Sequence, residues 1–324
     1  MNGNAWMRRR HFGAGLLGLA PLAAVGRAHA EEVVRLVVPF AAGSYTDTVA
    51  RLVSPGLSRQ LGRTIVVENR GGANGIIGAE YVARRVPSDG LTLLVGGASV
   101  NTINPSVYKS LPYDPERDLL PVARIGVLPF LLLVNASLPV RSVAELIQYA
   151  KANPGKLAYG TPNAATLVGS ETFKRGAGID LLSVSYTSSP QAMNDLASNQ
   201  IQVLIADQAT AMPLLQAGKV RLIAVTMKDR SAALPDTPTI AETLPGFDLS
   251  AWTGLLAPGW ATPDSVRPVY EALRAALADT DLQGRFKAIG FDIDLMAPDT
   301  FGPYLRAEIA KWRGVARDAG IQQQ

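Results

Sequence analysis

The chain has 324 residues, no cysteine and only two histidines, His11 and His29, both within the first thirty positions. Without that segment it offers no thiolate nucleophile, no imidazole base for a serine, no Cys/His zinc site and no c-type haem attachment. Four of the 31 Lys and Arg residues also lie there, and the remaining 27 match the 27 Asp and Glu residues. This balance gives no support for binding to nucleic acid or to an anionic membrane.

The first thirty residues have the pattern of an export signal. An arginine triplet at 8–10 is followed by an apolar run at 12–25 and by a small-x-small cleavage site, Ala-His-Ala, at 28–30. The run is too short to span a bilayer, and no stop-transfer segment follows it. We therefore expect a cleaved signal peptide at 1–30, a mature protein in the periplasm and no direct membrane insertion afterwards. The basic start fits both the twin-arginine and the Sec route.

Short β-branched runs alternate with amphipathic helical stretches along the rest of the chain. The pattern predicts strands at 33–39, 64–68, 91–95, 122–126, 130–134, 157–160, 182–185, 203–206, 221–226 and 255–257. It predicts helices at 46–61, 73–85, 143–152, 166–177, 189–199, 208–217, 264–279 and 299–319. Such a βαβα order predicts α/β domains with mainly parallel sheets covered on both faces. The length favours two domains.

Two helices carry local signals. The helix at 46–61 contains Pro55 and Gly56, which predict a kink because proline lacks a backbone donor and clashes with the preceding turn. The helix at 143–152 follows Ser142, a good N-cap, and Glu145 stands three residues further on. This spacing predicts a capping box.

The loop from Phe40 to Asp47 joins a buried strand to a helix. Ligands of open α/β sheets bind beyond the carboxyl ends of strands, and a helix start offers unpaired N–H groups that suit an anion. Gly43 lets the backbone approach a ligand closely, while Ser44 and Thr46 add hydroxyls. Alternatively, Thr46 or Asp47 only caps the helix.

The other strand ends carry weaker signals. Residues 96–101 resemble a nucleophile elbow, but Asn101 replaces its last glycine and no histidine remains, so a serine hydrolase is not supported. The glycine-rich stretch 71–78 gives no dinucleotide fingerprint and predicts a structural turn. Asp207 ends a strand, where it faces a ligand or caps the next helix; the sequence leaves both open. No acidic cluster has the spacing of a metal site, and no cofactor is expected.

Several stretches together resemble one family, and they follow in order over nearly all of 33–321. They are VPFAAGSYTD at 38–47, ARL at 50–52, VVENR at 66–70, DGLTLL at 89–94, INP at 103–105, LPYDP at 111–115, AGKVR at 217–221 and LPDTPT at 234–239. The chain resembles the Bug proteins, the extracytoplasmic solute receptors of tripartite tricarboxylate transporters.

The resemblance implies a periplasmic-binding-protein-like fold with two α/β lobes joined by a two-crossover hinge. Lobe one is expected at 31–127 plus 252–324, and lobe two at 128–251. The expected function is capture of a small carboxylate between the lobes by a monomer, which hands it to the permease subunits of a membrane transporter. Two alternatives stay open: a sensor that presents the ligand to a membrane histidine kinase, and a carboxylate-based hydrolase.

The resemblance also implies which residues bind the ligand. By position they are Phe40, Ala41, Ser44, Tyr45, Thr46 and Asp47 of the first loop, Ser99 of the same lobe, and Thr161, Asn163, Thr166 and Asp207 of the opposing lobe. The sequence departs from the family at three places: Ala-Ala-Gly-Ser at 41–44 replaces Pro-Pro-Gly-Gly, a frequent histidine is absent near Leu167, and Ala206 stands where a carboxylate is usual.

Overall fold

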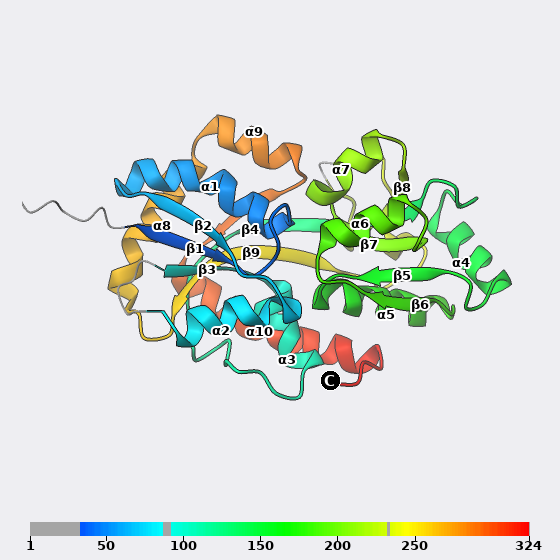
Figure 1. The fold of residues 1–324 in the computed structure, drawn as a ribbon, viewed down its shortest axis with the longest axis horizontal. Helices are drawn as coiled ribbons and strands as arrows, with labels where there is room; N and C mark the ends of the chain where they lie inside the picture. Colours follow the sequence, from blue (N-terminus) through cyan, green and yellow to red (C-terminus); the bar gives the residue numbers. More distant parts are fainter. Residues whose placement is uncertain (1–32, 87–91, 232–233, 324) are drawn as a thin grey trace, which may run out of the picture. The chain divides into compact units, whose positions relative to one another are not determined.

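A computed structural model describes residues 33–86, 92–231 and 234–323 of the chain (Figure 1). The predicted signal peptide at 1–30 lies outside the described residues. Strands and helices alternate along most of the chain, as predicted, and all the described residues belong to one compact unit.

Ten strands of the described residues form a continuous mixed sheet in the order β2-β1-β3-β9-β4-β7-β5-β6, with β10 and β8 paired to β4. Their bounds are β1 Val34–Val38, β2 Ile65–Asn69, β3 Thr92–Gly97, β4 Leu119–Asn135, β5 Ala158–Thr161, β6 Leu182–Ser185, β7 Val203–Asp207, β8 Val220–Val225, β9 Ser250–Pro258 and β10 Asp292–Met296.

The helices follow the prediction closely in the middle of the chain. Their bounds are α1 Tyr45–Leu61, α2 Ile76–Arg84, α3 Asn104–Val107, α4 Val143–Ala152, α5 Ala164–Ala177, α6 Ser189–Ala197, α7 Gln208–Gln216, α8 Pro263–Leu277, α9 Thr280–Ala288 and α10 Pro298–Asp318. Shorter helical turns are η1 Ala73–Gly75, η2 Ala98–Ile103, which is a π-helix, and η3 Ile240–Glu242.

Strand β4 divides the sheet into two halves. Its first part, up to Pro129, pairs with β9 and β10, while its second part, from Phe130, pairs with β7 and β8. We call β1, β2, β3, β9, β10 and the first part of β4 the first half, and β5 to β8 with the rest of β4 the second half. Each half contains one parallel block, β2-β1-β3 or β7-β5-β6, and every antiparallel pair involves β4 or β9.

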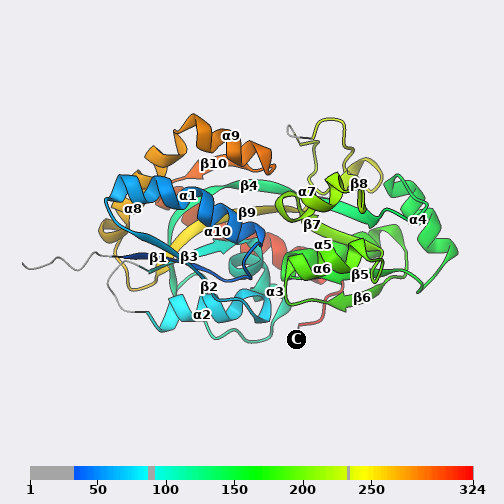
Figure 2. The same cartoon turned by 45° about the horizontal axis from the view of Figure 1, so that its top comes forward.

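The helices are distributed between these halves. Figures 1 and 2 show α1, α2, α8 and α9 beside the strands of the first half and α4 to α7 beside those of the second. The largest fully buried side chains of the first half include Trp252 and Phe301, whose rings meet edge to face at 5.3 Å. A separate buried cluster lies in the second half and includes Leu131, Leu133 and Met193.

Helix α1 runs through Pro55 without interruption, so the Pro55-Gly56 pair does not split the helix. Pro55 lies on the exposed side, and Gly56 is buried against α8. A Cβ on Gly56 would come within 2.7 Å of the Ala276 Cβ. The glycine is therefore there because the two helices approach closely, and it does not end the helix.

Three further expectations need correction. The strands predicted at 122–126 and 130–134 are parts of one strand, β4, because Pro129 sits where the pairing partners change. Helix α9 and strand β10 were not predicted. Ser142 caps α4 as predicted, but the Glu145 carboxylate accepts from the Arg141 amide and not from that of the N-cap residue.

Candidate functional site

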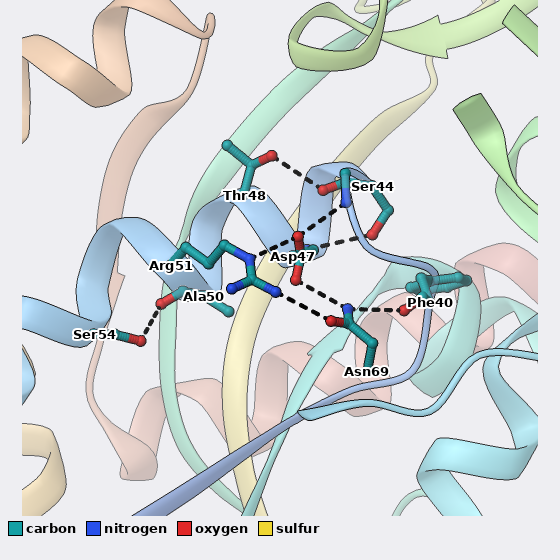
Figure 3. A network of polar contacts seen from close by, with 9 residues as sticks. Phe40, Ser44, Asp47, Thr48, Ala50, Arg51, Ser54 and Asn69 are labelled. Atoms are coloured by element: carbon teal, nitrogen blue, oxygen red, sulfur yellow. Dashed lines mark hydrogen bonds and ion pairs between the residues drawn. The ribbon is translucent and has the colours of Figure 1, made fainter. Parts of the chain in front are cut away.

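The loop between β1 and α1 is fixed by side chains around it (Figure 3). Ser44 is the N-cap of α1, and its hydroxyl accepts from the Asp47 amide at 3.4 Å. The Asp47 carboxylate accepts from the Gly43 amide, from the Arg51 Nε and from the Asn69 amide group, each at 2.9 Å. Asn69 of β2 also donates to the Phe40 carbonyl at 3.1 Å.

Asp47 is therefore a positioning residue for this loop, because its carboxylate binds the loop's own Gly43 amide and the neighbouring side chains of Arg51 and Asn69. Burial disfavours its charged form, but the bonds from Arg51, Gly43 and Asn69 outweigh burial and hold the pKa of Asp47 below its usual range. The amides of Tyr45 and Thr46, the first two of α1, have no intrahelical acceptor and remain available to a ligand.

We predict that Asp47→Asn lowers the free energy of unfolding by about 1–2 kcal/mol at pH 7, because a charge-assisted network becomes neutral. The Asp47 pKa is lower in the folded than in the unfolded protein. Its contribution is therefore present above the unfolded pKa and is lost as the pH falls below about 4. Urea unfolding of both proteins at pH 7 and pH 3 measures this; an unchanged difference at pH 3 would contradict it.

A small cavity of about 50 Å³ lies where the loop meets the second half of the sheet. It is lined by Phe40, Ser44, Tyr45, Thr46, Gly97, Ala98, Ser99, Phe130, Asn163, Ala165, Ser189, Asp207, Ala251, Trp252 and Thr253. The start of α1, the start of η2 and strand β9 contribute from the first half, and the starts of α5, α6 and α7 from the second. With Phe130 of β4, residues from seven separate parts of the chain thus converge on one point.

Ser99 connects the two halves directly across this cavity. Its hydroxyl donates to the Asn163 Oδ1 and accepts from the Ala165 amide, both at 3.2 Å. Asn163 is the N-cap of α5, and its Oδ1 also accepts from the Thr166 amide at 3.0 Å. The start of η2 therefore contacts the start of α5 directly.

Asp207 caps the next helix, one of the two roles that its sequence position left open, and its side chain also lies at the cavity. It is the N-cap of α7, where its Oδ1 accepts from the amide and from the hydroxyl of Thr210, each at 2.8 Å. It also lines the cavity and is 4% exposed. Burial raises the pKa of Asp207, and the bonds from Thr210 only partly oppose this effect.

Two buried hydroxyls of cavity residues, Tyr45 Oη and Thr253 Oγ1, have no hydrogen-bond partner. Tyr45 is 8% exposed and Thr253 is fully buried. Burial raises the pKa of Tyr45; interaction with the Thr253 hydroxyl lowers it, and the Asp207 charge raises it. Because buried polar groups are normally hydrogen-bonded, these two hydroxyls are polar groups that the protein itself leaves without a partner at the cavity.

The structure brings most of the predicted ligand residues together. Phe40, Ser44, Tyr45, Thr46, Ser99, Asn163 and Asp207 line the cavity. Four predicted residues do not line it: Ala41, Asp47, Thr161 and Thr166. Thr166 instead completes a capping box with Asn163 at the start of α5.

Sequence reasoning missed the contribution of β9. Ala251, Trp252 and Thr253 line the cavity, yet they carry no local motif, and the prediction identified only the end of this strand, at 255–257. Their place follows from the pairing of β9 with β3 and β4, which joins distant parts of the chain. No signal in the sequence around Thr253 could have identified it.

Neither a metal site nor a membrane span is found in the described part of the chain. No group of three or more His, Cys, Asp or Glu side chains among those residues could hold a metal ion. None of the helices described is long and apolar enough to cross a membrane.

The model of one protein family, described as the tripartite tricarboxylate transporter family receptor, matches residues 49–321. The chain belongs to this receptor family. The protein BugT of Bordetella pertussis is 31% identical to the receptor over 297 residues, which are 89% of this chain and 90% of BugT. The predicted membership of the Bug family is thereby confirmed.

Solved structures agree with the receptor's fold. The structure of R. palustris Rpa4515 with adipate is 37% identical, with a TM-score of 0.87, and covers 90% of the receptor and 98% of Rpa4515. MatC from Rhodopseudomonas palustris with bound malate is 30% identical, with a TM-score of 0.82, and covers 87% and 98%. The periplasmic-binding-protein-like fold is confirmed, and the chain is a solute-binding receptor by family.

Proposed function

We propose that the mature protein is a periplasmic receptor that captures a small carboxylate in the cavity between the two halves. The first and second halves correspond to lobes one and two, at 31–127 plus 252–324 and at 128–251. The closed, liganded form then docks to the permease subunits of a tripartite tricarboxylate transporter. The protein works as a monomer and carries out no reaction on its ligand.

The observation that carries this proposal is the lining of the cavity. The start of α1 offers two N–H groups without intrahelical acceptors, and the Tyr45 and Thr253 hydroxyls lie beside them without partners. A helix start attracts an anion through its partial positive charge. A carboxylate suits this set because its two oxygens accept from amides and hydroxyls alike. The adipate and malate bound by the two similar structures belong to this class.

Closure gives the receptor its signal to the transporter. The Ser99 contacts with the start of α5 form only when the halves approach, because they join residues on opposite sides of the cavity. A ligand that bonds to α1 on one side and to the second half on the other favours this closed state. The permease can then distinguish loaded from empty receptor by shape.

A thermal-shift screen tests the ligand class. Mono-, di- and tricarboxylates and amino acids are added to mature protein, and a ligand that binds only the folded state raises the melting temperature. We expect a carboxylate to do so, and we expect Tyr45→Phe to weaken that ligand about threefold to tenfold, because one hydrogen bond is lost.

Tyr113→Phe is the matched control. Its hydroxyl donates to the Val100 carbonyl at 2.7 Å and lies outside the cavity. This change lowers stability without changing affinity. A screen in which no carboxylate raises the melting temperature would overturn the proposal, as would equal affinity losses in the two variants.

A further inference from the structure

The strands that pair with β4 change within a few residues. Strands β9 and β10 pair with it up to Pro129 and Val127. Strands β7 and β8 pair with it from Phe130 and Leu131 onwards. The chain therefore passes from the first half of the sheet to the second at Pro129 and Phe130.

The chain returns to the first half at the start of β9. Ser250, the first residue of that strand, pairs with Pro129. The residue before it, Leu249, donates its amide at 2.8 Å to the carbonyl of Thr226, which directly follows β8. The two crossings thus lie side by side, and we call Pro129, Phe130, Leu249 and Ser250 the hinge.

Thr226 binds both crossings and is fully buried. Its hydroxyl donates to the Leu249 carbonyl at 2.7 Å and accepts from the Phe130 amide at 3.1 Å. Its own amide donates to the Phe130 carbonyl at 3.0 Å. The hydroxyl also lies 3.0 Å from that carbonyl, but it has a single hydrogen, and its shorter contact is the one with Leu249.

The hydroxyl doubles the contact of Thr226 with each crossing. Backbone bonds already join Thr226 once to Phe130 and once to Leu249, and the hydroxyl adds one bond to each. Valine has the branched shape of threonine but no hydroxyl, so it would keep only the backbone bonds. Serine would keep the hydroxyl. The two crossings are therefore joined to each other through one side-chain oxygen.

The cavity lies beside the hinge. Phe130 lines it, and so does Ala251, the neighbour of Ser250. Thr226 does not line the cavity, so it can influence a bound ligand only through the hinge.

We infer that Thr226 is the positioning residue of the hinge: its hydroxyl joins the two crossings, so that the halves turn about Pro129 and Ser250 as two rigid bodies. The ring of Pro129 fixes one of its two backbone torsions, which leaves few torsions to change. A hinge with few free torsions keeps a larger fraction of the ligand-free receptor in the binding-competent arrangement, and this raises the apparent affinity. The effect on affinity rests on the proposed function; the effect on the hinge does not.

Distances between two spin labels, measured by electron paramagnetic resonance, test the hinge without a ligand. The chain has no cysteine, so Gln60→Cys in α1 and Gln216→Cys in α7 place one label on an exposed residue of each half. We expect Thr226→Val to broaden the distribution of label distances and Thr226→Ser to keep it narrow. An unchanged distribution in folded Thr226→Val, or equal broadening in Thr226→Ser, overturns the inference.

Thr172→Val is the matched control. It makes the same chemical change in the second half, where the Thr172 hydroxyl donates to the Val168 carbonyl at 2.8 Å within α5. The label distances should stay as in the unmodified protein. Broadening as large as in Thr226→Val would show that the hinge bonds have no special role and would overturn the inference.

Isothermal titration calorimetry with adipate and with malate measures the effect on binding. We expect Thr226→Val to weaken every carboxylate that binds by one common factor, about threefold to tenfold, because a hydrogen bond to each crossing is lost and no ligand contact changes. Thr226→Ser and Thr172→Val should bind as the unmodified protein does. A loss confined to one of two bound ligands overturns the inference. If the label distances broaden but no carboxylate binds in this titration or in the thermal-shift screen, the proposed function falls and the hinge stands.

A melting temperature shows whether each variant is folded. If Thr226→Val does not fold, amide hydrogen exchange in the unmodified protein decides. The amides of Phe130, Thr226 and Leu249 should then exchange at one common slow rate, because residues joined in one unit open together. Three unrelated rates overturn the inference.

Discussion

Replacement of Asp207 by Asn is expected to strengthen the binding of a simple carboxylate about tenfold at pH 7.5. Asp207 shares a 50 Å³ cavity with the start of α1, so its charge repels an anion there. Asn is also a good N-cap, so the start of α7 should be kept. Calorimetry on both proteins measures the change. Asp195→Asn is the matched control, because Asp195 lies in the same half, outside the cavity, and accepts from the Tyr186 hydroxyl.

The same substitution should remove a pH dependence. Burial already raises the pKa of Asp207, and a bound carboxylate raises it further, so binding takes up a proton. Affinity in the unmodified protein is then highest in acid and falls as the pH rises through the raised pKa that Asp207 has before binding. Asp207→Asn should show no such fall. Weaker binding in that variant would mean that Asp207 accepts a hydrogen bond from the ligand.

Replacement of Gly126 by Ala is expected to cost about 2–3 kcal/mol of unfolding free energy and to weaken ligand binding as well. A Cβ there would overlap the Asp292 carbonyl and come within 2.7 Å of the Phe291 ring. Phe291 packs on Phe286 and on Tyr45, with ring centres 4.8 Å and 5.9 Å apart. Displacing Phe291 therefore disturbs Tyr45, the cavity residue whose ring packs against it. Chemical denaturation and calorimetry measure the two effects.

Gly284→Ala provides the comparison. Gly284 lies in α9, close in sequence to Phe286, and a Cβ there meets nothing within 4 Å. Alanine favours a helix over glycine by up to about 1 kcal/mol, so this variant should be unchanged or slightly more stable. Equal losses of unfolding free energy in the two variants would show that the close approach at Gly126 does not make an added Cβ destabilising there.

The sequence predicted the elements best where one local signal determines a boundary. Helix α4 begins and ends as expected because Ser142 caps it and apolar residues recur at helical spacing. Helix α9 was not predicted because its nine residues are mostly polar and include Gly284. Strand β4 was divided in two because Pro129 resembles a strand break, whereas Pro129 pairs with Ser250 of β9 and the next residue, Phe130, with Asp207 of β7.

The candidate site was predictable only on the side with a strand-to-helix loop. The anion-binding geometry of the 40–47 loop follows from sequence order alone. The hydroxyl of Thr253 joins it only because β9 returns to the sheet after more than a hundred residues in the second half. Asp47 was expected to contact the ligand. In the structure its carboxylate instead accepts from Asn69 of β2, and nothing in the sequence indicated this pairing.

The path of the chain through the sheet determines the order in which its parts can be completed. The second half is built mainly from the continuous run between the two long strands, so it needs little more than residues 130–226 to close. The first half still needs β9, β10, α8, α9 and α10, all from the last quarter of the chain. During synthesis, the second half can therefore fold first, while the first half must wait for the C-terminus. Ligand-binding ability thus arises late, at the final step of assembly.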